Sequence, residues 1–207
     1  SSLSDQMKLS NKFRSKAISI SLDPRAAVIS GGHAADGAYW YDDLTGNWIT
    51  SSYYVDSLPA WVADFNKKRI TDIYLEKTWE PILSMDQYIE SLDDENGFET
   101  GLKGQRTFPY NLEELSGLKK KKPDYSILKF TPYGNTLTKD MAITAIVSEN
   151  LGKNGHADFL FVNFAASAYA GKYYNSWSVE MQDIYLQLDR ELEHFLQFID
   201  NEVGLKN

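Results

Sequence analysis

The sequence contains no cysteine, which excludes disulfide bonds and thiolate chemistry and leaves the redox compartment unreadable. It has no apolar run long enough to span a bilayer, so no membrane span is expected. Its first residues, SSLSDQMKLSNKF, resemble the start of a helix rather than an export signal, so no signal peptide is predicted. Positive charge is scarce, with 21 basic against 29 acidic residues and a net charge of −8. That deficit argues against a nucleic-acid partner or an anionic membrane surface.

The usual sequence motifs of catalytic sites are also missing. The chain has only three histidines, His33, His156 and His194, and none lies in an HxH or HExxH pattern. There is no GxSxG turn and no Cys-His pair, and the paired glycines before His33 are not followed by the GK[ST] of a phosphate loop. From these motifs alone, no catalytic residue and no metal ligand is predicted.

The stretch Ala157–Asp200 carries the clearest pattern in the chain. Its apolar run at residues 159–164 is broken only by Asn163, which is typical of a strand covered on both faces in a parallel sheet. Apolar residues then recur at three- and four-residue steps, predicting a helix over residues 179–202 that Ser178 caps. Ligands of open α/β sheets bind just beyond the carboxyl ends of strands, so residues 165–178 are the expected site.

The rest of the chain predicts an α/β protein whose sheet is incomplete or has an exposed edge. A glycine-containing turn between two aromatic runs predicts a hairpin, and Ser57 is expected to cap a helix. Few apolar positions recur between residues 84 and 118, so a long excursion is expected there. The predicted helices lie near residues 4–14, 57–68 and 136–150, the hairpin at 39–54, and further strands at 17–22, 71–76 and 125–130.

Two features of this pattern leave alternatives open. Arg25 lies just beyond the strand at residues 17–22, where it serves either as an anion clamp or as a surface salt bridge; position alone favours the salt bridge. Aromatic residues make up 14% of the chain and gather between residues 39 and 79. They form either buried packing or a stacking platform for sugars or bases, and the frequency of buried aromatics favours packing.

Five separated stretches carry a resemblance to a known family. They are FRSKAISISLDPRAAVISGGHAADGAYWYD, GNWITSSYYVDSLPAWVADFN, KTWEP, TPYGNTLTKDMAITAI and DFLFVNFAASAYAGKYYNSWSVEMQDIYLQLDRELEHFLQFIDNEVG. In order and spacing the chain resembles an internal segment of the alkaline phosphatase superfamily. It is most similar to the bacterial type I phosphodiesterase and nucleotide pyrophosphatase-like branch that includes PafA-type alkaline phosphatases.

The resemblance implies part of a three-layer α/β sandwich, a mostly parallel sheet flanked by helices, with an inserted aromatic hairpin or cap region. It implies one segment over residues 1–207, with core parts at about 1–35 and 125–207 and a cap-like insertion at about 36–124. Family members use two zinc ions beside a Thr or Ser nucleophile to hydrolyse phosphate monoesters or diesters. They also imply a periplasmic or secreted location.

This chain differs from the family pattern at two places, the zinc-binding motif and the phosphate-contacting motif. A zinc-binding motif like S-S-T-D-Y-V-G-H reads AASAYAGK here, so the Asp position is Ala168 and the His position is Lys172. Alanine has no donor atom, and a protonated lysine repels a dication. The family's phosphate-contacting Lys-x-Arg reads Asp23-Pro24-Arg25, which keeps the arginine and reverses the charge of the lysine. The nucleophile and the other zinc ligands of the family are expected outside this segment.

Three hypotheses for function follow. The first is a catalytically inactive phosphatase-like segment, a pseudoenzyme for which no zinc is expected, with Arg25 as its one phosphate contact. The second is an active zinc-dependent phosphate-ester hydrolase that is completed by the remainder of the same precursor or by a second chain. The third is a carbohydrate- or peptide-binding module whose surface is formed by Tyr39, Trp40, Trp48, Tyr53 and Tyr54. The substrate and the oligomeric state are not predicted.

Overall fold

A four-stranded sheet lies at the centre of the computed structural model, which describes residues 2–204. The strand order is β3-β2-β1-β6, with β1 parallel to both of its neighbours and β3 antiparallel to β2. The strands are β1 (Ala17–Ser21), β2 (Gly37–Asp42), β3 (Asn47–Ile49) and β6 (Phe159–Asn163). The predicted strands at 17–22 and 158–164 and the predicted hairpin are therefore confirmed.

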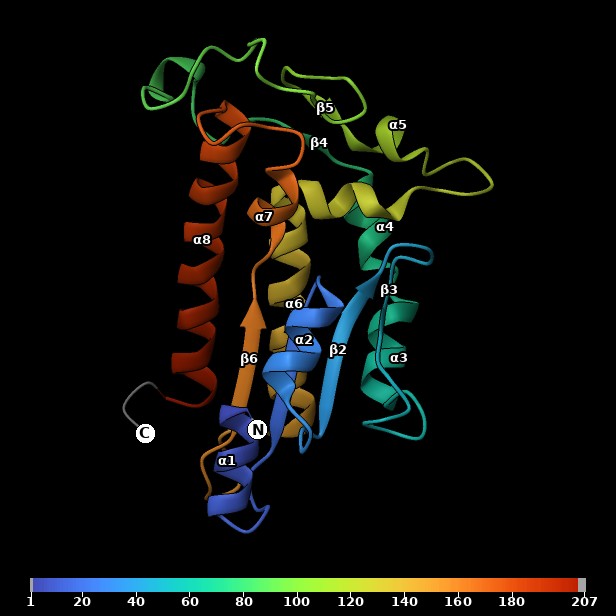
Figure 1. Cartoon of the computed structure of the whole chain (residues 1–207), viewed down its shortest axis with the longest axis vertical. Coiled ribbons are helices and arrows are strands. Elements are labelled where there is room, and N and C mark those ends of the chain that lie inside the picture. The colour runs from blue at the N-terminus through green and yellow to red at the C-terminus, as the bar shows by residue number, and fades with distance from the viewer. Residues whose placement is uncertain (1, 205–207) are drawn as a thin grey trace.

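Helices cover both faces of this sheet, as Figure 1 shows. The helix α2 (Pro24–Gly31) lies on one face with α1 (Leu3–Ser10) packed against it, and α6 (Pro132–Glu149) and α3 (Ala60–Lys67) lie on the other. The long helix α8 (Val179–Glu202) packs along α6. This is a mixed α/β fold with a mostly parallel sheet between helical layers, as expected.

The central strand β1 is buried at all five positions. Alternate residues of a strand point to opposite faces, so Ser19 and Ser21 face one helical layer and Ile18 and Ile20 face the other. On the serine side, a Cβ added to Gly31 of α2 would meet the Cβ of Ser19 at 3.3 Å. Small residues on both elements thus let α2 lie close to the sheet.

The strand β6 forms one edge of the sheet and is only half-buried along its whole length. As expected, helices contact both of its faces, α2 on one and α6 on the other, and its partial exposure arises at the edge, where no further strand among residues 2–204 pairs with it. The alternative of a sheet with an exposed edge is confirmed. A continuous apolar run identified the strand but did not report whether its neighbours are present.

Two predicted strands are helical. Residues 70–75 form the helix α4 (Ile70–Leu75), in which the buried residues Thr71 and Leu75 are four positions apart and so share one helical face. The stretch Tyr125–Phe130 is a 3₁₀ helix that begins where Asp124 accepts a hydrogen bond from the Ser126 amide. Both stretches are rich in β-branched and aromatic residues, and tertiary packing outweighs that local preference.

Two further helices lie where the sequence predicted loops. The short helix α7 (Ala166–Ala170) follows β6, and α2 begins at Pro24, which was expected only to end a strand. Asp23 caps α2 by accepting hydrogen bonds from the amides of Arg25 and Ala26. An N-cap aspartate followed by proline at the first helical position is a start signal for a helix, and it was interpreted only as a strand end.

The other predicted helices are confirmed with shifted ends. Ser178 caps α8 by accepting from the Met181 amide, as predicted. The helix expected near 136–150 begins earlier, at Pro132, and that near 4–14 is shorter, since α1 ends at Ser10. The third, α3, begins after Pro59, and Ser57 does not cap it.

A long segment, residues 78–124, crosses the carboxyl end of the sheet and is called the cover segment below (Figure 1). Within it lie β4 (Thr78–Trp79), β5 (Tyr110–Asn111), the 3₁₀ turn Met85–Gln87 and α5 (Leu112–Ser116). The hairpin strands β2 and β3 belong to the main sheet, while the division of the chain into core and inserted parts stays a prediction. Among residues 2–204, no helix combines the length and the apolarity that crossing a bilayer requires.

Candidate functional site

The strands β1 and β6 are parallel neighbours, so their carboxyl ends lie side by side at one end of the sheet, beneath the cover segment (Figure 1). The side chain of Asn163, at the end of β6, donates to the Ser21 hydroxyl at 3.0 Å, and the Asp23 amide donates to the same hydroxyl at 2.9 Å. The one polar residue in the apolar run thus ties the two strand ends together. From this point β1 leads into α2 and β6 leads into α7.

The helix α6 fixes the position of α7. The side-chain oxygen of Asn135, which is fully buried on α6, accepts a hydrogen bond from the Ala166 amide at 3.2 Å. Ala166 and Ala170 are completely buried, so the small residues of α7 pack against the protein. Ala168 and Lys172 point away from that packed face and are exposed.

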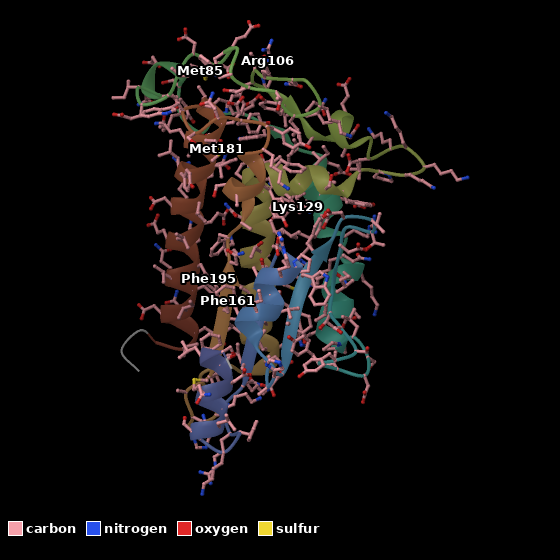
Figure 2. All side chains as sticks on the ribbon, viewed as in Figure 1. Met85, Arg106, Lys129, Phe161, Met181 and Phe195 are labelled. Atoms are coloured by element: carbon pink, nitrogen blue, oxygen red, sulfur yellow. The ribbon has the colours of Figure 1, made fainter. Side chains whose placement is uncertain are left out.

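Tyr169 lies at the centre of the charged groups in this region. Its hydroxyl donates to an Asp23 carboxylate oxygen at 3.1 Å. The ammonium of Lys129 lies 4.4 Å from the centre of its ring, and that of Lys172 lies 5.2 Å away, both within cation–π range. Figure 2 places Lys129 between α2 and the cover segment.

The cations of the region differ in how firmly they are held. Lys129 is 8% exposed and pairs with Asp43 at 2.5 Å, so its charge is neutralised inside the protein. Arg25 pairs with Asp23 at 3.2 Å, but its side chain is 86% exposed. The salt-bridge alternative for Arg25 therefore matches the structure, and a contact between Arg25 and phosphate stays a prediction.

Asp23 carries a negative charge at neutral pH. Burial acts to raise its pKa, but hydrogen bonds from Arg25, the Ala26 amide and Tyr169 outweigh burial and hold the pKa below its ordinary value. An ionised carboxylate at this position repels a phosphate group and competes with it for Arg25. The geometry thus agrees with the charge reversal noted in the sequence.

The side chains present here do not fit a zinc ion. Ala168 offers no donor atom and Lys172 is a cation, while the nearby carboxylates of Asp23 and Asp43 are engaged by Arg25, Tyr169 and Lys129. Within the part of the chain that the structure describes, no three His, Cys, Asp or Glu side chains gather as a metal-binding group. A zinc ion bound here would therefore lack the anionic or neutral ligands that it needs to balance its charge.

The proposed aromatic binding surface is not assembled as expected. Tyr39 and Trp48 are buried, 2% and 1% exposed, and belong to the hydrophobic core, which corrects the third hypothesis for these two residues. Tyr53 and Tyr54 are more accessible and contact each other edge to face. Together with the carboxyl-terminal end of α2, they line a pocket of about 550 Å³.

Sequence reasoning found Ala168, Lys172, Asp23 and Arg25, and the structure brings the segments that carry them together around Tyr169. It missed Lys129 and its partner Asp43. Lys129 lies in a stretch that was predicted as a strand, and no local signal connects it to an aspartate 86 positions away.

No family model matches the chain, but three curated proteins match nearly all of it. It is 38% identical over 207 residues to alkaline phosphatase PhoV of Synechococcus elongatus, with 99% of this chain and 37% of the relative covered. It is 40% identical over 208 residues to alkaline phosphatase PafA of Elizabethkingia meningoseptica, with 99% and 37% covered. It is 41% identical over 211 residues to a protein of Myroides odoratus named as a calcium-transporting ATPase, with 100% and 38% covered.

The solved structures agree with these relatives. The crystal structure of wild-type alkaline phosphatase PafA matches with a TM-score of 0.90 at 40% identity, over 97% of this chain and 38% of that one. A variant of PafA matches with the same TM-score at 39% identity. The chain belongs to the alkaline phosphatase superfamily, of whose α/β fold it forms a segment. Within the superfamily it lies on the branch of the PafA-type enzymes.

The chain spans about 37–38% of the length of these relatives. What it shares with them is therefore a part of their fold. The activity of a whole protein of this type is taken up below as a proposal.

Proposed function

We propose that this segment of an alkaline-phosphatase-like protein does not support two-zinc phosphoryl transfer, and that it keeps a structural or ligand-binding role. The observation that carries the proposal is the pair Ala168 and Lys172 on the exposed side of α7 and just after it. Their positions, one turn apart beyond the end of β6, are those at which the family motif has two zinc ligands.

The electrostatics of the region support the proposal. The ammonium groups of Lys172 and Lys129 both lie over the Tyr169 ring. Asp43 neutralises the charge of Lys129, so Lys172 is the cation that adds positive charge beside the place of the lost ligands. Such a cation opposes a zinc ion but favours an anion. Arg25, which is exposed, is the group expected to contact the phosphate of a bound ligand.

Zinc titration by calorimetry, combined with a p-nitrophenyl phosphate assay, tests this proposal. The chain is expected to bind no zinc in stoichiometric amounts and to show no turnover above buffer with zinc present. Tight binding at one or more zinc ions per chain together with turnover contradicts it. An Arg25→Ala variant is expected to weaken any phosphate binding that remains, with Arg190→Ala on the exposed surface of α8 as its matched control.

A second candidate, an active zinc-dependent phosphate-ester hydrolase completed by another part, is favoured by one observation. The β6 edge is unpaired within residues 2–204, and the matched relatives are more than twice as long as this chain. The occupant we propose for that edge is a parallel strand from the remainder of the same precursor or from a second chain that supplies it.

Intact mass analysis of the natural gene product separates the two candidates. A product of the relatives' length, or a copurifying chain that completes the sheet, supports the second candidate. A product that begins near Ser1 with nothing copurifying contradicts it. From the family resemblance we also propose a periplasmic or secreted location, which cell fractionation tests by the compartment that retains the protein.

A further inference from the structure

A buried cluster of acids and tyrosines joins the cover segment to the start of α8, apart from the residues around Tyr169. At its centre is Glu180, in the first turn of α8, which is completely buried. One of its carboxyl oxygens, Oε1, accepts a hydrogen bond from the Tyr110 hydroxyl at 2.5 Å. The other, Oε2, has no hydrogen-bond partner among residues 2–204.

Two more polar atoms of the cluster are buried without a partner in the described part of the chain. They are the hydroxyl of Tyr174 and Oε2 of Glu99, on residues that are 2% and 5% exposed. With Glu180 they come from three segments: α8, the loop between α7 and α8 (residues 171–178), and the cover segment. An ionised Glu180 presents only acceptors here, and a buried acceptor without a donor is unfavourable. A proton on Oε2 supplies a donor.

Two of these segments, the cover segment and the 171–178 loop, are joined by backbone hydrogen bonds. The amides of Thr100 and Gly101 both donate to the Tyr173 carbonyl at 3.1 Å, and the Leu92 amide donates to the Trp177 carbonyl at 2.7 Å. Figure 2 shows Met85 and Arg106 of the cover segment above Met181, near the start of α8. These bonds fasten the cover segment to the 171–178 loop directly beside Glu180.

The charged groups that face Glu180 lie in the cover segment, and the titratable hydroxyls near it come from Tyr110 of the cover segment and Tyr174 of the 171–178 loop. Burial, together with the negative charges of Glu99 and Asp94, raises the pKa of Glu180 to about 8. The hydrogen bond from Tyr110 and one from its own amide act in the opposite direction and are outweighed. Burial also raises the pKa of Glu99, Asp94, Tyr110 and Tyr174. Arg106 is the cation that faces the cluster, and it acts on Glu99.

We propose that a proton on Glu180 latches the cover segment onto the 171–178 loop, and that the latch loosens as the pH rises from acid through neutral. With the proton bound, the buried carboxyl is neutral and can donate. Without it, a negative charge is buried against Glu99 and Asp94, and opening the interface admits water to it.

The sign of the pH dependence follows from the raised pKa of Glu180. The closed form keeps its proton up to about pH 8, whereas in the open form Glu180 has its ordinary pKa near 4.5. Between these values closing takes up one proton, so the closing equilibrium weakens about tenfold for each pH unit. Above the pKa of the closed form the dependence levels off.

Hydrogen exchange measured by NMR from pH 6 to 9 tests the latch in the whole chain. After correction for intrinsic exchange, protection of the Leu92, Thr100 and Gly101 amides is expected to fall about tenfold from pH 6.5 to pH 7.5. Protection of the Ile18 and Ile20 amides in β1 is the internal reference and is expected to change less. In Glu180→Gln, which carries no charge at any pH, protection of the three amides is expected to be flat. The matched control Glu193→Gln, on the exposed side of α8, is expected to behave as the unmodified chain.

A second variant keeps the proposal testable if Glu180→Gln does not fold. Glu99→Gln removes a neighbouring negative charge, so the pKa of Glu180 falls and the loss of protection is expected to level off at a lower pH than in the unmodified chain. Flat protection of the three amides in the unmodified chain overturns the proposal. So does a pH dependence that survives in Glu180→Gln. None of these outcomes depends on whether the chain binds zinc or a phosphate ester.

Discussion

Single buried side chains connect distant parts of this protein, and Asp183 on α8 connects the most. It is completely buried, and its carboxylate accepts from the indole of Trp79 at 2.6 Å, the Ile82 amide at 2.9 Å and the Tyr88 hydroxyl at 2.6 Å. The Gln187 side chain donates to it as well, at 2.6 Å. Asp183 therefore supplies the acceptors for three donors of the cover segment and for one on its own helix.

Replacing this carboxylate leaves those donors buried without an acceptor. Each such donor costs on the order of 1–3 kcal/mol, so Asp183→Ala is expected to lower the free energy of unfolding by about 3 kcal/mol or more. Urea denaturation followed by circular dichroism measures the change. The matched control Asp189→Ala, at an exposed position of the same helix, is expected to stay within about 0.5 kcal/mol of the unmodified chain. Equal losses in the two variants contradict this role for Asp183.

At the scale of elements, the start of α8 depends on a buried cap. Ser178 is completely buried and accepts from the Met181 amide at 3.1 Å. Ser178→Ala removes this acceptor and is expected to lower the free energy of unfolding by about 1 kcal/mol in urea titrations. Arg190→Ala, which exchanges an exposed side chain in the middle of the helix, is the control. A Ser178→Ala protein as stable as that control contradicts the capping role.

Because the edge of β6 is unpaired within residues 2–204, individual amides of this strand are expected to differ in their rate of hydrogen exchange. The Phe159 amide donates to the Lys16 carbonyl at 2.8 Å, and amides alternate in direction along a strand. The amides of Leu160 and Val162 therefore point away from β1, toward the unpaired edge. In hydrogen exchange of the chain alone they are expected to exchange at least about 100-fold faster than those of Ile18 and Ile20, which lie between two paired strands. Equal protection in β6 and β1 would mean that another chain covers the edge.

How far the sequence predicts an element depends on where its stabilising contacts come from. The helix α8 was predicted at its observed bounds because its apolar period, its cap at Ser178 and Gly204 beyond its end are all local signals. The helix α4 was predicted as a strand because what decides it is the burial of Thr71 and Leu75 against distant parts of the chain. The exposure of β6 depends on which strands are present beside it, which no residue of β6 records.

The candidate site was predictable in its position and in its changed residues but not in its contacts. The apolar run and the family motif located Ala168 and Lys172 at the end of β6. The gathering around Tyr169 depends on long-range contacts: Lys129 and Asp43 are 86 positions apart, and Tyr169 and Asp23 are 146 apart. Such contacts are set by the packing of α2, α7 and the 3₁₀ helix, so no local pattern in the sequence encodes them.

At the scale of the whole molecule, residues 2–204 form a packed α/β unit that matches part of a longer structure. The segment reproduces the PafA structure with a TM-score of 0.90 while covering 38% of it. Its core is continuous from the sheet to the cover segment, whereas the β6 edge is unpaired among residues 2–204. We propose that the scaffold of the family's zinc site is kept in this chain and that the two zinc ligands of this segment are replaced by Ala168 and Lys172.

A chimera with PafA tests this proposal most directly. It distinguishes an effect of the two replaced zinc ligands from an effect of the parts of the fold that this chain does not contain. The segment of PafA that aligns with this chain is replaced by this chain, once unchanged and once as the double variant Ala168→Asp and Lys172→His. With p-nitrophenyl phosphate and zinc, the unchanged chimera is expected to show no turnover, and the double variant to exceed it at least about 100-fold with more zinc bound per molecule. Equal turnover and equal zinc content in the two chimeras would contradict the account.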